Sequence, residues 1–140
     1  MTEFSIGALA AQTGVKVPTI RYYESIGLLP AAARTEGNRR AYDAAASRRL
    51  RFIRHARELG FEVEAIRQLL TLAETPKQSC HAADEVARLH LIDIDSKIAR
   101  LQALRDEVAR MLDECAAGRR QDCRVIEVLA DHGQCLHDAH

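Results

Sequence analysis

The hydrophobic positions in the second half of the chain follow one long helical pattern. Apolar residues recur at alternating spacings of three and four, namely Leu91, Ile94, Ile98, Leu101, Leu104, Val108 and Met111, and Cys115 comes four residues later. Charged residues fill the gaps, and no Gly or Pro interrupts the run. The spacing predicts a helix that begins near Cys80 and carries one coiled-coil-like seam with a single slip in phase. A helix cannot bury its own seam, so we expect a partner helix.

Shorter patterns at the N-terminus predict two helices joined by a tight turn. Residues 5–13 carry an apolar stripe, with Ser5 at the position of an N-cap, and Gly14 follows. Residues 17–24 begin with Pro18 in the first turn. Helix, glycine turn and second helix form the helix-turn-helix pattern, whose second helix enters the major groove of DNA.

The next segment, 30–42, predicts a two-stranded wing. Its centre, 36–38, has the composition of a turn, and its arms carry Arg34, Arg39 and Arg40. Arginines placed in this way suit DNA phosphates. The alternative interpretation is a solvated basic loop.

Three further helices complete the predicted order. The first spans 43–59 with Asp43 as its cap, and the second spans 62–72. The third is a short helix around 125–129, before a loose tail. In the first, we expect the arginines to point mostly outward and five residues to face inward: Leu50, Phe52, Ile53, Ala56 and Leu59. The expected fold class is therefore mainly α.

Charge is distributed unevenly along a chain whose net charge is zero. Residues 1–75 carry 11 Lys/Arg and 8 Asp/Glu, whereas residues 76–140 carry 9 and 12. Eight arginines lie within 34–57, against two acidic residues. This patch predicts a polyanionic partner for the first half of the chain only.

Neither a signal peptide nor an apolar stretch long enough for a membrane span is evident, so we expect a cytoplasmic protein with no membrane partner. In that compartment, four cysteines indicate metal or redox ligands rather than disulfides.

The spacing of the cysteines predicts a site shared between two chains. With a helical rise of about 1.5 Å per residue, Cys80 and Cys115 lie on the order of 50 Å apart, too far for one metal or disulfide. In an antiparallel homodimer, Cys80 of one chain comes beside Cys115 and Cys123 of the other. A two-fold dimer would then hold two three-sulfur sites.

The motifs together resemble the MerR family of bacterial transcriptional regulators. They are residues 6–10, 19–24, 27–30, Arg34, Asn38, Arg40, Tyr42 and 52–61, and the resemblance runs from about residue 5 to 130. It implies a non-enzymatic regulator with a winged helix-turn-helix head and linking helix pair in 1–75. An antiparallel coiled-coil dimerisation helix in 76–114 and a metal-binding loop, short helix and tail in 115–140 would follow.

The resemblance also implies a mode of action and a set of DNA contacts. Such homodimers bind promoter DNA with or without inducer, and the inducer makes them bend and undertwist the spacer so that RNA polymerase finds aligned elements. The implied DNA-binding residues are Thr19, Arg21, Tyr23, Arg34, Arg39, Arg40 and Arg57. The chain departs from some relatives at Pro18 and Arg39. We expect Tyr22, like Ile20, to pack in the core.

The cysteines resemble those of the metal-sensing branch of the family. Cys115 and Cys123 match its two-cysteine loop. A cysteine at the start of the dimer helix, here Cys80, resembles the pattern of the divalent-ion sensors. Three thiolates suit a soft divalent ion better than Cu(I), and His90 resembles the cadmium and lead sensors, so we expect Cd²⁺ or Pb²⁺. Zn²⁺, Hg²⁺ and a thiol-based redox sensor remain alternatives. Cys135, His137 and His140 are candidates for a second, weaker site.

Overall fold

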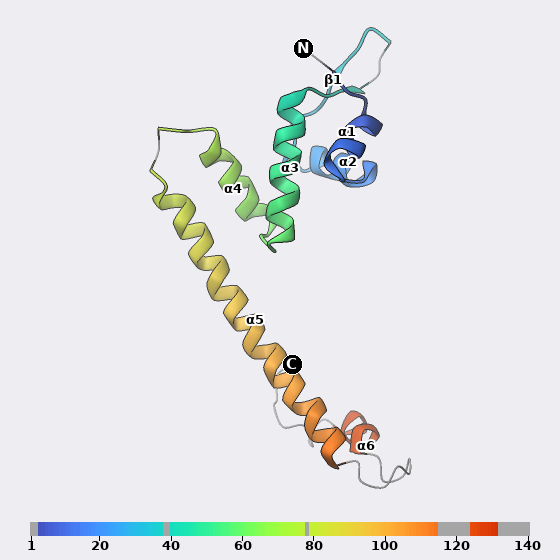
Figure 1. Ribbon diagram of the computed structural model, residues 1–140, viewed down its shortest axis with the longest axis vertical. Coiled ribbons are helices and arrows are strands. Elements are labelled where there is room, and N and C mark those ends of the chain that lie inside the picture. Colours follow the sequence, from blue (N-terminus) through green and yellow to red (C-terminus); the bar gives the residue numbers. More distant parts are fainter. Residues whose placement is uncertain (1–2, 38–39, 78, 115–123, 132–140) are drawn as a thin grey trace. The chain divides into compact units, whose positions relative to one another are not determined.

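The computed structural model describes residues 3–37, 40–77, 79–114 and 124–131 (Figure 1). Its elements are α1 (Ile6–Thr13), α2 (Val17–Ser25), β1 (Ala33–Arg34), β2 (Arg40–Ala41), α3 (Ala44–Glu58), α4 (Val63–Ala73), α5 (His81–Glu114) and α6 (Arg124–Ala130). The mainly helical class and the order of elements predicted from the sequence are confirmed. The chain divides into an N-terminal unit, Met1–Val86, and a C-terminal unit, Ala87–His140.

Local capping chemistry sets the ends of the first two helices. The backbone N–H of Ala8 donates to Ser5 Oγ at 3.1 Å, so Ser5 is the N-cap of α1 as predicted. Gly14 ends α1 with φ of 74°, a left-handed conformation in which its N–H donates to the Ala10 carbonyl oxygen. Pro18 lies in the first turn of α2, where no backbone donor is needed.

The wing is a short antiparallel pair in which Ala33 is opposite Ala41 and Arg34 is opposite Arg40. An isolated bridge joins Phe4 to Tyr42 directly after β2, with N···O distances of 2.6 and 2.8 Å. The N-terminal segment therefore pairs with the base of the wing. The two-stranded prediction is confirmed, and Arg39 lies outside the described residues.

The core of the N-terminal unit lies where α3 packs against α1 and α4. Its fully buried side chains are Leu9, Ile20, Leu28, Leu29, Leu50, Ile53 and Ile66. The expectation that Phe52 and Leu59 face inward was wrong, because both are exposed. A helix turns about 100° per residue, so Phe52 lies about 200° from Leu50, and Leu59 follows the last residue of α3.

The helix α5 is one continuous helix of 34 residues (Figure 1). Most of its apolar seam is exposed. Leu91, Ile98, Leu101 and Val108 are exposed, whereas Met111 packs near the end of α5 and Val128 is buried in α6. The predicted long helix is confirmed, and at about 1.5 Å per residue it is on the order of 50 Å long. Its exposed seam is the surface for which the sequence pattern predicts a partner.

Candidate DNA-binding and metal-sensing surfaces

The exposed face of α2 differs from the predicted one at the two tyrosines. Tyr22 is 54% exposed, so its expected core packing was wrong, whereas Tyr23 is only 8% exposed. The buried stripe of α2 consists of Ile20 and Tyr23, three residues apart, and Tyr22 falls outside it. Arg21 is exposed and Thr19 is half-buried.

A cavity of about 400 Å³ lies beside the turn that joins α1 to α2, and three of the predicted DNA-contact residues line it, namely Thr19, Tyr23 and Arg57. Besides these residues, the basic side chains of Lys16 and Arg54 line it, together with the acidic Glu58, which pairs with Arg54 at 3.0 Å. Arg57 Nη1 also donates to the Phe61 carbonyl oxygen at 3.0 Å, which fixes its direction. Basic and hydroxyl groups gathered at one surface can hold backbone phosphates.

Several arginines of α3 and α4 hold the helix-turn-helix together. Arg54 Nη1 donates to the Thr13 carbonyl oxygen at 2.6 Å, and Arg67 Nη2 donates to that of Ile26 at 2.9 Å. These carbonyls lie at helix ends, where no intrahelical donor reaches them. The arginines of α3 belong to the basic patch for which the sequence predicts a polyanionic partner, and the local pattern does not reveal this second use.

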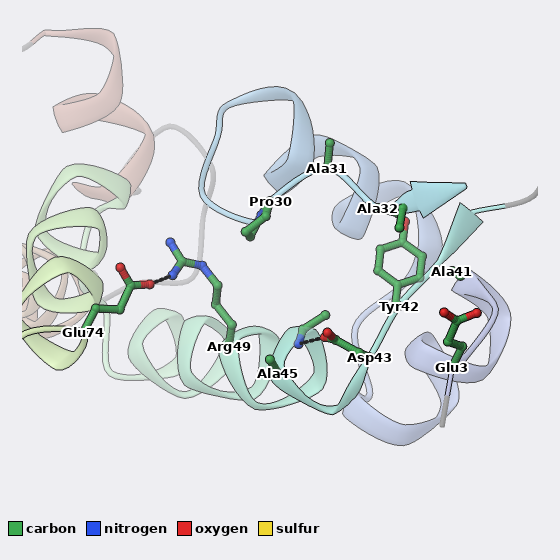
Figure 2. Close-up of a pocket in the computed structure, with 12 residues that line it drawn as sticks. Glu3, Pro30, Ala31, Ala32, Ala41, Tyr42, Asp43, Ala45, Arg49 and Glu74 are labelled. Atoms are coloured by element: carbon green, nitrogen blue, oxygen red, sulfur yellow. Dashed lines mark hydrogen bonds and ion pairs between the residues drawn. The ribbon is translucent and has the colours of Figure 1, made fainter. Parts of the chain in front are cut away.

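Arg49 belongs to the same group and borders a cavity of about 440 Å³ behind the wing, shown in Figure 2. Its Nε donates to the Leu28 carbonyl oxygen at 2.8 Å, and its Nη1 pairs with Glu74. Figure 2 also shows Asp43, whose Oδ1 accepts from the Ala46 backbone N–H at 2.9 Å and caps α3 as predicted. Arg49 thus ties α3 to the segment after α2 and to the end of α4.

The wing residue Arg40 is paired within the chain. Its Nη1 lies 3.3 Å from Oε2 of Glu24, the last residue of the motif in α2. Arg34, opposite Arg40 in the wing, is exposed. Glu24 precedes Arg40 by 16 residues, a separation for which helical and hairpin spacing predict no contact. The sequence pattern therefore did not predict this pair.

Cys80 directly precedes α5 and its thiol is exposed. The thiol donates to Asp84 Oδ1 at 3.7 Å, a neighbour four residues along that sequence reasoning did not single out. His90 is half-buried in α5. No group of three His, Cys, Asp or Glu side chains within the described ranges could hold a metal, and Cys115, Cys123, Cys135, His137 and His140 lie outside those ranges.

An exposed thiol fits the metal that the sequence implies. Soft metal ions prefer thiolate sulfur, and a thiol at the surface is accessible to a metal ion from solution. The Cys80 thiol has this chemistry and exposure.

A network of ion pairs joins α5 to α6 on either side of residues 115–123. Arg110 Nη2 contacts Oε1 of the buried Glu107 at 2.5 Å, and Arg110 Nη1 lies 3.2 Å from Glu114. Arg124 Nε reaches the same Glu114 at 2.5 Å and continues to Glu127 at 3.3 Å. The last residue of α5 and the first of α6 are therefore directly paired. The pairs of Arg110 with Glu107 and Glu114 follow the helical spacings of three and four residues. The sequence pattern did not predict the pair between Glu114 of α5 and Arg124 of α6.

None of the helices in the described ranges combines the length and apolar character that crossing a membrane requires.

Comparison with known proteins gives two family matches. The profile of MerR HTH family regulatory proteins matches residues 4–72, and that described as MerR, DNA binding matches residues 47–111. The heavy metal-dependent transcription regulator 2 of Rhizobium meliloti (strain 1021) is 37% identical over 127 residues, 91% of this chain and 86% of that protein.

Two solved structures with bound metal are also similar. The transcription regulator PbrR691 from Ralstonia metallidurans CH34 in complex with lead(II) is 36% identical, with a TM-score of 0.78, and the match covers 90% of this chain and 98% of that chain. The regulator MerR from Bacillus megaterium MB1 in complex with mercury(II) is 29% identical, with a TM-score of 0.68, over 91% and 99% of the two chains.

Proposed function

Because this chain belongs to the MerR family of transcriptional regulators, we propose that it controls a promoter in response to a soft divalent metal ion. It is a DNA-binding regulator and not an enzyme. The observation that carries the metal-sensing assignment is the exposed Cys80 thiol directly before α5. It is supported by the similarity of 90% of this chain to the regulator PbrR691, whose structure was solved with lead(II).

The DNA-binding part of the proposal places α2 in the major groove and the wing on the backbone. The exposed Arg21 and the half-buried Thr19 are the side chains of α2 suited to reach base edges or phosphates. Arg34, Arg39, Arg40 and Arg57 serve as phosphate contacts. Tyr23 contributes its ring edge beside Thr19, because most of the ring is buried.

We take the functional unit to be an antiparallel homodimer. The exposed seam of α5 supports this, because an apolar stripe of this length is stable in water only when another surface covers it. In this arrangement Cys80 of one chain and Cys115 and Cys123 of its partner supply three thiolates, and His90 is a candidate fourth ligand.

Three thiolates select the metal by softness and charge. Cd²⁺ and Pb²⁺ are the preferred inducers, with Hg²⁺ and Zn²⁺ as alternatives, since Zn²⁺ favours a full tetrahedron. The tail residues Cys135, His137 and His140 form a second, weaker candidate site. A bound metal would supply a fixed link between two chains, and the head would respond by distorting the promoter spacer for RNA polymerase.

Transcription from a target promoter with the purified chain and RNA polymerase, titrated with Cd²⁺, Pb²⁺, Hg²⁺, Zn²⁺ and Cu⁺ under reducing conditions, tests the proposal. We expect activation by one divalent ion and loss of that response in Cys80→Ser, with DNA binding retained. Response to Cu⁺ alone would contradict the three-thiolate site. Response to an oxidant and to no metal would replace it with redox sensing.

A mixed dimer tests whether each site is shared between chains. Dimers that pair a Cys80→Ser chain with a Cys115→Ser chain keep one complete set of three thiolates, whereas either variant alone keeps none. We expect the mixed dimer to bind one metal ion tightly. A mixed dimer that binds no more metal than the separate variants would contradict the shared site.

A further inference from the structure

Three side chains join the wing to α2 within the N-terminal unit. Glu24 of α2 accepts from the Tyr42 hydroxyl through Oε1 and pairs with Arg40 Nη1 at 3.3 Å through Oε2. Each carboxylate oxygen therefore has its own partner. Both partners belong to β2 or to the residue directly after it.

The contact of Glu24 with Tyr42 and Arg40 is largely shielded from water. The side chain of Glu24 is 9% exposed and Tyr42 is 2% exposed, whereas the Arg40 side chain is 38% exposed. A carboxylate with so little access to water is stable only when charged or hydroxyl groups satisfy it. Burial, followed by the hydrogen bond and charge of Glu24, raises the pKa of Tyr42 above its ordinary value of 10.0.

The wing needs such an anchor, because its strands are only two residues long. A hairpin of this size is not stable alone in water, so its direction depends on what holds its base. The backbone of Tyr42 is bridged to Phe4, and its hydroxyl reaches Glu24. Tyr42 thus links the N-terminal segment, the wing and α2.

We propose that Glu24 is a positioning residue for DNA binding: it fixes the wing relative to α2, so that Arg34 and Arg40 reach phosphates while α2 lies in the groove. This inference rests on the proposed DNA-binding mode. A guanidinium has five N–H donors, so the pair of Arg40 with Glu24 is compatible with a phosphate contact. Glu24 itself touches no DNA in this arrangement.

The Glu24→Gln variant separates positioning from simple charge. The change makes the N-terminal unit more positive by one charge, which by itself strengthens binding to DNA. The amide of glutamine, however, has one acceptor oxygen and no charge, so it loses the charge-assisted bond to Arg40 or to Tyr42, and its NH₂ group can meet the Tyr42 oxygen only if the hydroxyl turns from donor to acceptor. Positioning therefore predicts weaker specific binding, the opposite sign to the effect of charge.

The matched control is Glu64→Gln, which removes the same charge from the same unit. Glu64 lies in α4, its side chain is 78% exposed, and it pairs with Arg67 at 3.4 Å on the surface of the same helix. Tyr42→Phe is the second variant, because it deletes the hydroxyl and keeps the buried ring.

The experiment measures the Kd of the full chain for the tightest duplex selected from a random-sequence pool, and for a scrambled duplex, over a range of salt concentrations. We expect Glu24→Gln to bind the selected duplex about tenfold more weakly, with a salt slope shallower by about 0.9 for each phosphate that the wing no longer neutralises. Tyr42→Phe is expected to bind several-fold more weakly, and Glu64→Gln to stay within about twofold of the wild type. Equal affinities of Glu24→Gln and Glu64→Gln would overturn the proposal.

Two measurements made without DNA test the positioning role of Glu24 independently of the proposed DNA-binding function. Amide hydrogen exchange in β1 and β2 should be about tenfold faster in Glu24→Gln and unchanged in Glu64→Gln, with exchange in the rest of the unit showing that the fold persists. Tyrosine absorbance in alkaline titration should show a lower pKa for Tyr42 in Glu24→Gln. Unchanged wing exchange would overturn the proposal, whereas a wild-type chain that binds no duplex would contradict the proposed function instead.

Discussion

Gly14 holds the turn between α1 and α2 in a conformation that alanine adopts only at a cost. Its φ is +74°, and a Cβ added there would overlap Arg54 Nη1 and lie 2.9 Å from Arg54 Cζ. Such an overlap is impossible without movement. Arg54, whose side chain is 49% exposed, has room to swing outward, but it then gives up its 2.6 Å hydrogen bond to the Thr13 carbonyl oxygen.

The two costs add to a measurable decrease in the stability of Gly14→Ala. The left-handed conformation costs a non-glycine residue about 1–2 kcal/mol. A hydrogen bond from a charged donor is worth about 1.5–3 kcal/mol, which we halve to about 1 kcal/mol because Arg54 is half-exposed. We therefore expect a decrease of about 2–3 kcal/mol in the free energy of unfolding of the N-terminal unit.

Urea denaturation at a fixed protomer concentration measures this decrease, with Gly7→Ala as the matched control. Gly7 lies in α1, and a Cβ added there would meet Ser5 Oγ at 3.9 Å, an ordinary contact. Alanine there should stabilise by about 0.5–1 kcal/mol, because glycine is unfavourable within a helix. A decrease below about 0.5 kcal/mol in Gly14→Ala would refute the reasoning. In an Arg54→Ala background the clash is absent, and only the backbone cost should remain.

Three further changes test single contacts. Ser5→Ala removes the N-cap of α1 and should cost about 1 kcal/mol in urea denaturation, with Ser5→Thr retaining most of the stability. Glu107→Ala removes the pair between Arg110 and the buried Glu107 and should speed amide exchange at the end of α5, whereas unchanged exchange would show that this pair does not stabilise the helix end. The hydrogen bond from Lys97 lowers the pKa of Asp93, so this contribution to stability is present above the ordinary value of 3.8 and fades as pH falls below it. In the Lys97→Gln variant, we expect an NMR titration to show the pKa of Asp93 closer to 3.8.

Short-range features of the fold were predictable from the sequence, because their chemistry is local. Ser5 and Asp43 cap helices with their own side chains, and Gly14 ends α1 because it tolerates a positive φ. The long helix α5 followed from its seam. Each of these signals lies within a few residues of the structure that it specifies.

Contacts between distant segments were not predictable in this way. Whether Tyr22 or Tyr23 is buried depends on how α2 rolls against the rest of the core, and the periodicity of nine residues does not fix that angle. The pair of Glu24 with Arg40 joins two elements whose spacing follows no local rule. The metal ligands remain a prediction, because Cys115 and Cys123 lie outside the described residues.

The arginines that donate to backbone carbonyls at the end of α1 and after α2 give basic character a part in folding as well as in DNA affinity. Arg49 uses Nε for the Leu28 carbonyl oxygen and Nη1 for Glu74, two directions that the single ammonium of lysine cannot serve together. Exchanging Arg49, Arg54 and Arg67 for lysine would leave the net charge unchanged and yet loosen the turns that orient α2. A related chain that no longer bound DNA would therefore be expected to keep these arginines for the stability of its turns.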